Sequence, residues 1–213
     1  ACRESIPELE SIALWRLDEC TLDDGRGPTR LSGAVATAEI FDLLHVRPLL
    51  GSFFTGEQQV PTADNVVVLT ESLWRSQFRR DPAVIGRKLR LEGKLCEIIG
   101  VAPRIMESFD ARVRLVRPLS WDHSQPPGET GYSPRLFGLV RAGLPQAQIA
   151  AQVTALERKI HDTASTKAKD FYERTGHGMR VEKFSAQRAQ PVVVALSLLQ
   201  GGVLIVLLIG TVN

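Results

Sequence analysis

The four histidines are the residues best able to do chemistry, and they stand in no pattern that catalysis requires. None belongs to an HExxH motif, and no order of nucleophile, histidine and carboxylate suggests a triad. His123 follows Asp122 in a polar loop, and His161 lies at the end of a predicted helix. Such positions are typical of solvated or capping residues. The other two are His45 and His177.

The three cysteines also lack a functional spacing. Cys2, Cys20 and Cys96 form no CxxC pair, and no histidine lies at metal-ligand spacing from them. The motifs GxSxG, GxxxxGK(S/T) and GxGxxG are absent as well, so nucleophile, nucleotide and dinucleotide sites lack a signature. We therefore predict no catalytic, cofactor-binding or metal-binding residue, no cofactor, and a chain that is not an enzyme.

The distribution of charged residues indicates a protein that contacts a membrane rather than one that binds a nucleic acid. The formal net charge is only +2, and the densest basic stretch (Arg75, Arg79, Arg80, Arg87, Lys88 and Arg90) is typical of a solvated helix and hairpin face. A protein that binds a phosphate backbone usually has a basic stripe, so we expect no nucleic-acid partner. Residues 189–213, by contrast, contain no charged side chain.

Residues 192–212 read VVVALSLLQGGVLIVLLIGTV, with few polar interruptions. At ~1.5 Å per residue, such a helix could cross a hydrocarbon layer of ~30 Å. A buried helix that is apolar on every face is the alternative, but it is rare in a domain of this size. Pro191 stands where the helix would begin, a position at which its missing N–H costs nothing.

Turn-forming residues predict a hairpin near the start of the chain. The strand-like run IALWRL within residues 11–22 ends in a turn cluster at residues 23–28, and residues 29–35 form the predicted returning strand. Thr37 is then expected to cap a short helix. The apolar face of that helix would carry Ile40, Phe41 and Leu44.

The central segment predicts a strand followed directly by a helix. Residues 66–69 are β-branched or apolar, Thr70 can cap a helix over residues 71–80, and Leu69 and Trp74 stand at the two positions of a hydrophobic staple. We expect Leu69, Trp74 and Phe78 to anchor this part of the fold.

A second hairpin follows this helix. Asp81-Pro82 predicts a capped single turn that Gly86 can end, and Glu92-Gly93 joins predicted strands at residues 87–91 and 94–101. We expect the ring of Trp74 to be buried against this strand pair.

The last third of the chain contains the clearest helix. Residues 145–163 place Ile149, Val153, Leu156 and Ile160 on one apolar stripe. Residues 120–135 predict a long loop, and residues 136–141 and 179–184 predict strands.

Several blocks together resemble a known family. VVVLTESLWRSQFRRDPAVIGRKLRLEGKLCEIIGVAP at residues 66–103 and LSGAVATAEIFDLLHVRPLLGSFFT at residues 31–55 are similar to the MacB-like periplasmic core domain of bacterial ABC transporter permeases of the FtsX/MacB/LolC type. The terminal apolar segment ending in LLIGTVN also resembles the helix that follows this domain in the family. The blocks occur in family order over about the whole chain.

The resemblance implies an α+β fold, a two-lobed mixed α/β extracytoplasmic domain followed by a transmembrane helix. Residues 1–48 and 134–190 would form the membrane-proximal lobe, and residues 49–133 would form a second lobe inserted in the first. Residues 191–213 would be the start of the membrane domain, because permeases of this family carry a first transmembrane helix, then this domain, then three further helices.

The resemblance also implies partners and a location. These are an ABC ATPase subunit or domain on another part of the transporter, a homodimer or a permease pair, and a periplasmic adaptor. Residues 1–190 would lie outside the bacterial inner membrane, where the domain would couple ATP hydrolysis to periplasmic movement or export of a substrate (mechanotransmission, efflux). The alternatives are a membrane-tethered binding or adaptor module without transport, and a membrane-anchored enzyme.

The membrane helix is testable by truncation. A fragment ending near Arg188 should stay in solution without detergent, whereas the full 213 residues should need detergent, because only the full chain contains the apolar segment. Sedimentation of both after purification measures this, and equal solubility would contradict the prediction.

Overall fold

The computed structural model describes residues 6–23, 25, 27–108, 110–120, 135–141, 143–163, 169, 173–174, 179 and 181–182. The chain divides into two compact units, Ala1–Ala142 and Gly143–Asn213. No helix among the described residues is long and apolar enough to cross a membrane. The predicted membrane helix at residues 192–212 lies outside the described residues.

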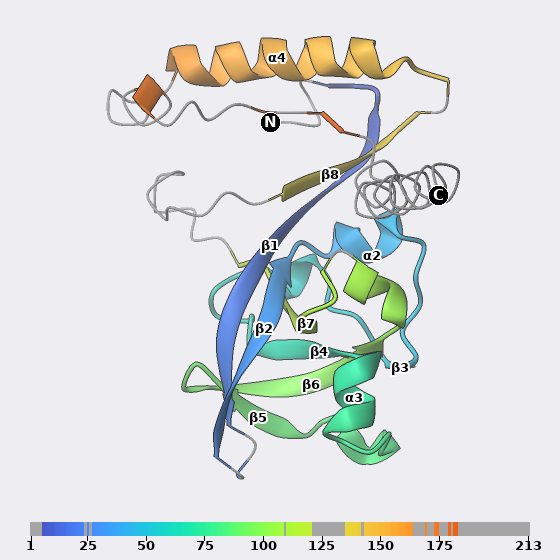
Figure 1. Cartoon of the computed structure of the whole chain (residues 1–213), viewed down its shortest axis with the longest axis vertical. Coiled ribbons are helices and arrows are strands. Elements are labelled where there is room, and N and C mark those ends of the chain that lie inside the picture. Colours follow the sequence, from blue (N-terminus) through green and yellow to red (C-terminus); the bar gives the residue numbers. More distant parts are fainter. Residues whose placement is uncertain are drawn as a thin grey trace, which may run out of the picture. The chain divides into compact units, whose positions relative to one another are not determined.

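The first unit is built on one sheet of eight strands (Figure 1). The strands are β1 (Leu9–Asp23), β2 (Pro28–Ala36), β3 (Leu50–Gly51), β4 (Val66–Thr70), β5 (Lys88–Leu91), β6 (Lys94–Ala102), β7 (Val113–Pro118) and β8 (Arg135–Val140). Among the described residues of this unit, the helices are α2 (Glu39–Leu43) and α3 (Glu71–Ser76), with 3-10 turns η1 (Gly56–Gln58), η2 (Pro82–Val84) and η3 (Arg104–Ser108).

The order of the strands closes the sheet on itself. Neighbours follow the order β2-β7-β4-β6-β5-β1, and β1 also pairs with β2. The β2–β7 and β4–β6 pairs are parallel, and the remaining pairs are antiparallel. β8 extends this arrangement by pairing with β1, and β3 pairs with β6. The mixed α/β character of the prediction is therefore confirmed.

Both predicted hairpins are present. In β1–β2 the last pair is Asp23 with Pro28, and the turn between them includes two glycines with positive φ. In β5–β6 the turn residues Glu92 and Gly93 have φ of 49° and 78°, as a tight two-residue hairpin turn requires.

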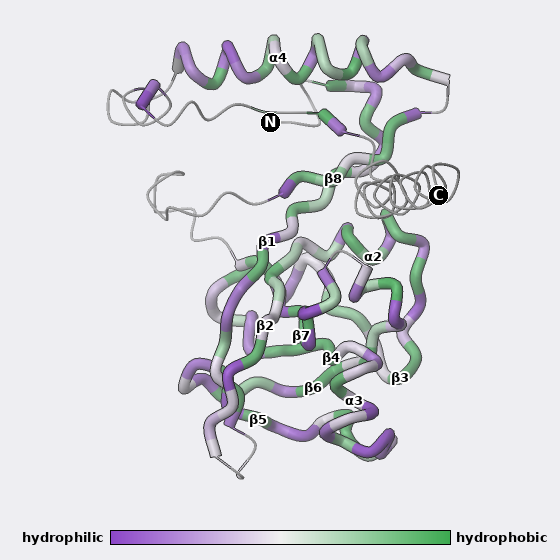
Figure 2. The backbone as a smooth tube through the Cα atoms, in the orientation of Figure 1, coloured by the Kyte–Doolittle hydropathy of each residue, from purple (hydrophilic) through white to green (hydrophobic). Residues whose placement is uncertain are grey.

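Two buried clusters occupy the two faces of β4. The first contains Ala13, Trp15, Ala34, Ala36, Ile40, Phe41, Phe54, Val68, Ala102, Met106, Val113 and Val116. The second contains Cys20, Leu22, Val67, Leu69, Leu73, Val84, Leu89, Leu91, Cys96, Ile98, Val101 and Leu115. Because a strand sends alternate side chains to opposite faces, a strand buried on both faces must be apolar throughout. Figure 2 shows β4 as such a strand.

The predicted helix over residues 71–80 is shorter than expected, because α3 ends at Ser76. Thr70 does cap it, since its Oγ1 accepts a hydrogen bond from the N–H of Leu73. The helix cannot continue because Arg79 and Arg80 have φ of 53° and 60°, in the left-handed region.

Of the three predicted anchors in this segment, Leu69 is fully buried, whereas Trp74 and Phe78 are partly buried against the second cluster. That cluster includes side chains from β5 and β6, the predicted strand pair. The indole N–H of Trp74 donates to the carbonyl of Asp81 over 2.9 Å, and this bond is itself partly buried. Leu73, which we did not predict as an anchor, is buried instead.

Thr37 was wrongly predicted as a helix cap. The cap of α2 is Ala38, which makes no side-chain hydrogen bond. Thr37 Oγ1 instead accepts a hydrogen bond from the N–H of Leu14 in β1. Ile40 and Phe41 are buried as predicted.

The second unit contains α4 (Gln146–Thr163), in agreement with the predicted helix. Ile149 is buried, and Val153, Leu156 and Ile160 are half-buried. In Figure 2 hydrophilic and hydrophobic residues alternate along this helix. The predicted loop at residues 120–135 and strand at 179–184 lie mostly outside the described residues; Met179, Val181 and Glu182, which are described, are not in a strand.

A matched pair of leucines tests the importance of β4. Leu69→Ala should cost about 2–5 kcal/mol because the side chain is completely buried. In a fragment ending near Arg188 the melting temperature should fall by roughly 5–15 °C. Leu95→Ala, at a leucine that is 51% exposed, should change the melting temperature little. Equal effects in the two variants, measured by circular dichroism, would contradict this burial pattern.

Candidate functional site

The feature of the first unit with the clearest mechanical consequence is the long strand β1, which pairs with β8, β2 and, at its last two residues, β5. Its first half, from Leu9 to Trp15, pairs with β8, and its second half, from Trp15 to Asp23, pairs with β2. Trp15 belongs to both registers, since it lies opposite both Ala36 and Arg135. Residues 9–15 and 135–140 form a two-stranded segment, which we call the β1–β8 ribbon (Figure 1).

The ribbon is held to the body of the sheet by buried side chains. Ala13 and Trp15 are buried in the first cluster, and Phe137 of β8 packs against the same cluster. An isolated two-stranded hairpin is marginally stable in water, so this packing is what allows the ribbon to persist.

Thr37 adds a polar clamp at the same place. Its N–H donates to the carbonyl of Leu14 over 3.0 Å, and its hydroxyl oxygen accepts from the N–H of Leu14 over 3.1 Å. Both backbone groups of Leu14 are therefore satisfied at the point where β1 changes partner. The sequence predicted that Thr37 caps a helix, whereas in the structure Thr37 binds the backbone of Leu14.

The two ends of the ribbon strands lie together. Leu9 is paired with Val140, and the N–H of Arg141 donates to the carbonyl of Glu8 over 3.1 Å. The chain therefore enters β1 and leaves β8 at one end of the ribbon. A displacement of these two connections acts on a single element that is continuous with the buried core.

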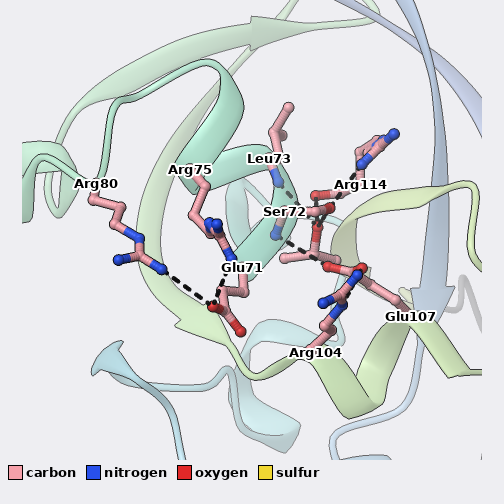
Figure 3. A network of polar contacts seen from close by, with 9 residues as sticks. Glu71, Ser72, Leu73, Arg75, Arg80, Arg104, Glu107 and Arg114 are labelled. Atoms are coloured by element: carbon pink, nitrogen blue, oxygen red, sulfur yellow. Dashed lines mark hydrogen bonds and ion pairs between the residues drawn. The ribbon is translucent and has the colours of Figure 1, made fainter.

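A polar network holds α3 to β7 and η3 (Figure 3). The hydroxyl of Thr70 donates to the carbonyl of Arg114 over 3.0 Å, and the guanidinium of Arg114 donates to Ser72 Oγ over 2.7 Å. The N–H of Ser72 donates to a carboxylate oxygen of Glu107 over 3.0 Å. The carboxylate of Glu71 also pairs with two arginines at the surface of α3, at 3.8 and 3.9 Å. Such exposed pairs contribute little, so the bonds of Thr70 and Ser72 position the helix.

One partly buried ion pair links β1 to β7. The Arg117 guanidinium contacts the Asp18 carboxylate, and the two side chains are 19% and 25% exposed. Since β2 lies between these two strands, the pair ties three neighbours of the closed sheet together.

The ionisable groups with shifted pKa values are not activated for catalysis. Burial raises the pKa of the Cys20 thiol to about 11, although the nearby Arg117 acts in the opposite direction. Burial also raises the pKa of Cys96. A hydrogen bond from Arg112 lowers the pKa of the Asp110 carboxyl. A thiol with a raised pKa is a poor nucleophile near neutral pH, because the thiolate is the reactive form.

Two of the four histidines lie among the described residues, one in each unit. His45 lies in an exposed turn after α2, with φ of 50°, and His161 lies in the last turn of α4. His123 and His177 lie outside the described residues, as does Cys2. Within the part of the chain that the structure describes, no group of three or more His, Cys, Asp or Glu residues could hold a metal ion.

Sequence reasoning missed β7 and the double pairing of β1. β7 contains two arginines among its apolar residues, which hides the alternation that predicts a strand. The 15-residue length of β1 is a usable signal, because a strand that exceeds the usual ~5–6 residues can serve more than one neighbour.

Two solved structures share this fold. The periplasmic region of MacB from Actinobacillus actinomycetemcomitans aligns with a TM-score of 0.56 at 16% identity, covering 71% of this chain and 67% of that one. The extracellular domain of the noncanonic ABC-type transporter YknZ from Gram-positive bacteria aligns with a TM-score of 0.55 at 14% identity, covering 75% and 81%. A comparison with curated protein sequences finds no match.

The fold thus defines a mixed α/β domain of the kind that these transporters carry outside the membrane. The family itself follows from the sequence, because residues 1–156 match the model of the MacB-like periplasmic core domain. The chain belongs to the MacB-like periplasmic core domain family, as the resemblance of its blocks implied.

The burial of the two described cysteines leads to a test with thiol reagents. In a Cys2→Ser variant, Cys20 and Cys96 should react with an aromatic disulfide reagent at pH 8 only after unfolding in guanidinium chloride, because both are buried and protonated. Rapid labelling of either thiol in the folded chain would contradict the structure.

The raised pKa of Cys20 also predicts that the folded chain loses stability at alkaline pH. The pKa of Cys20 rises from 9.0 to about 11 on folding, so the unfolded chain loses this proton first as the pH increases. The stabilising contribution is complete below pH 9 and is lost as the pH rises toward 11. The melting temperature should decline over this range, and the decline should be smaller in Cys20→Ala than in the parent chain.

Proposed function

We propose that this chain is the extracytoplasmic domain of an ABC transporter permease, which couples ATP hydrolysis by a partner ATPase to movement or export of a substrate outside the bacterial inner membrane. The chain itself performs no enzymatic step in this proposal. The family assignment supports the transporter class, and the geometry of the β1–β8 ribbon supports the mechanical role.

The observation that carries the mechanical role is the shared end of the ribbon. Because Leu9 and Val140 are paired there, a force applied to the chain on either side of the domain reaches both strands together. Trp15 and the Thr37 clamp tie the ribbon to the core, so the closed sheet would move as one body. Protein interiors are close-packed and transmit displacement with little compression.

The remaining parts of the proposal follow the family pattern. Residues 191–213 would begin the membrane domain, and residues 1–190 would be extracytoplasmic. The domain would have two lobes, residues 1–48 with 134–190 and residues 49–133. Its partners would be an ABC ATPase, a second permease copy or a related permease, and a periplasmic adaptor.

The coupling is testable without knowledge of the substrate. In the full permease with its ATPase, reconstituted in vesicles, spin labels at Lys94→Cys in two copies should change their separation when ATP is hydrolysed or trapped. Insertion of Gly-Ser-Gly after Arg141 adds flexible slack beside the shared end of the ribbon, so the change in separation should be lost while ATP hydrolysis continues.

The matched control is the same insertion after Gly25, in the β1–β2 turn. This insertion lengthens a turn away from the shared end and should leave the ATP-dependent change intact. If the unmodified permease hydrolyses ATP and its labels never move, the coupling proposal is wrong, and a tethered binding module without transport is favoured.

A further inference from the structure

A hollow beside α3 combines unpaired positive charge with a buried apolar floor. Its volume is about 390 Å³, which is at the lower end of the range of ligand pockets. Leu89 and Ile98 lie behind it and are almost completely buried, so they close its base and offer a ligand little surface of their own. Arg79, Arg87 and Lys88 line it with exposed side chains, so they form its rim.

The three cations are not equivalent. Arg87 pairs with the carboxylate of Asp81, and its Nε donates to the carbonyl of Ala83 over 3.0 Å. The charge of Arg87 is therefore already neutralised within the wall. Arg79 and Lys88 form no ion pair with any described residue, so these two lining residues have no counter-ion from this part of the chain.

The backbone that carries Arg79 is held in an unfavourable conformation. Arg79 and Arg80 are consecutive non-glycine residues with positive φ, which is costly for side chains with a Cβ. Three hydrogen bonds maintain the turn: the N–H of Arg80 to Trp74 O at 3.1 Å, the N–H of Asp81 to Phe78 O at 2.9 Å, and the indole of Trp74 to Asp81 O. Strained backbone that is fixed by its surroundings is common at binding sites.

We propose that this hollow binds an acidic segment of a partner protein, with one carboxylate between Arg79 and Lys88 and a neighbouring apolar side chain against Phe78. An arginine can bind a carboxylate through two parallel hydrogen bonds, and the lysine adds a point charge.

Other anionic partners fit the hollow less well. A phospholipid would need apolar surface for its chains, yet none of the exposed large hydrophobic residues within the described ranges lines the hollow. A nucleic acid would need a continuous basic surface, and the net charge of the chain is only +2. The proposal goes beyond the transport function, because the hollow would bind its ligand with or without coupling to an ATPase.

The test is direct binding by the full 213-residue chain in a non-ionic detergent. The probe is a fluorescein-labelled peptide, Glu-Leu-Glu-Glu-Phe-amide, and its control carries Gln in place of each Glu. Fluorescence anisotropy should show that the acidic peptide binds at least tenfold more tightly, since the control cannot form charge-assisted hydrogen bonds. Raising the salt concentration should weaken the binding of the acidic peptide but not that of the Gln control.

Variants of the rim locate the binding. Arg79→Asn removes the charge and keeps a residue that tolerates positive φ, and it should raise the Kd about tenfold. Lys88→Glu should raise the Kd further through repulsion. Arg47→Gln and Lys94→Gln, at exposed cations outside the hollow, should change the Kd less than about twofold. Thermal melting by circular dichroism confirms that each variant is folded.

Several results would overturn the proposal. One is equal binding of the acidic and Gln peptides, and another is an unchanged Kd in folded Arg79→Asn and Lys88→Glu. Displacement of the peptide by millimolar inorganic phosphate would show a general anion site only. Binding of short-chain phosphatidylglycerol that depends on Arg79, without peptide binding, would assign the hollow to a lipid headgroup. None of these results bears on the ATP-dependent movement of the domain.

Discussion

β1 has to pair with β8 along its first half and with β2 along its second half, and the arrangement of the first unit depends on this exchange at Trp15. A strand that changes partner would leave backbone groups unpaired at the junction, at a substantial cost in free energy. Thr37 removes that cost by bonding to both the N–H and the carbonyl of Leu14. The buried ring of Trp15 fills the space beneath the same point. The exchange is therefore well supported by hydrogen bonds and by packing.

This constraint separates a stiff interior from an adaptable surface. The closed order of strands and the Asp18–Arg117 pair across β2 resist sliding of one strand past another. The turn at Arg79 and Arg80, in contrast, is strained and lies outside the two buried clusters. The two proposed roles, transmission of displacement and binding of a partner, would therefore fall to different elements of this unit.

Local chemistry was sufficient to predict the elements whose signals lie within a few residues. The β5–β6 hairpin follows from Glu92-Gly93, and the strand β4 with its cap follows from a β-branched run ending in Thr70. The prediction was wrong where a distant contact prevailed. Thr37 bonds to β1 rather than to its own helix, and α3 stops at Ser76 because the following turn bonds to Trp74 and Asp81.

The sequence by itself determined the family, the hairpins, the long amphipathic helix and the lack of any local catalytic motif, because each depends on residue order over short spans. Only the tertiary structure decided the parallel pairing of β2 with β7, the shared end of β1 and β8, and the hollow lined by the turn after α3, β5 and β6. These features join residues far apart in the chain, and their free energy comes from mutual burial and pairing that no short segment contains.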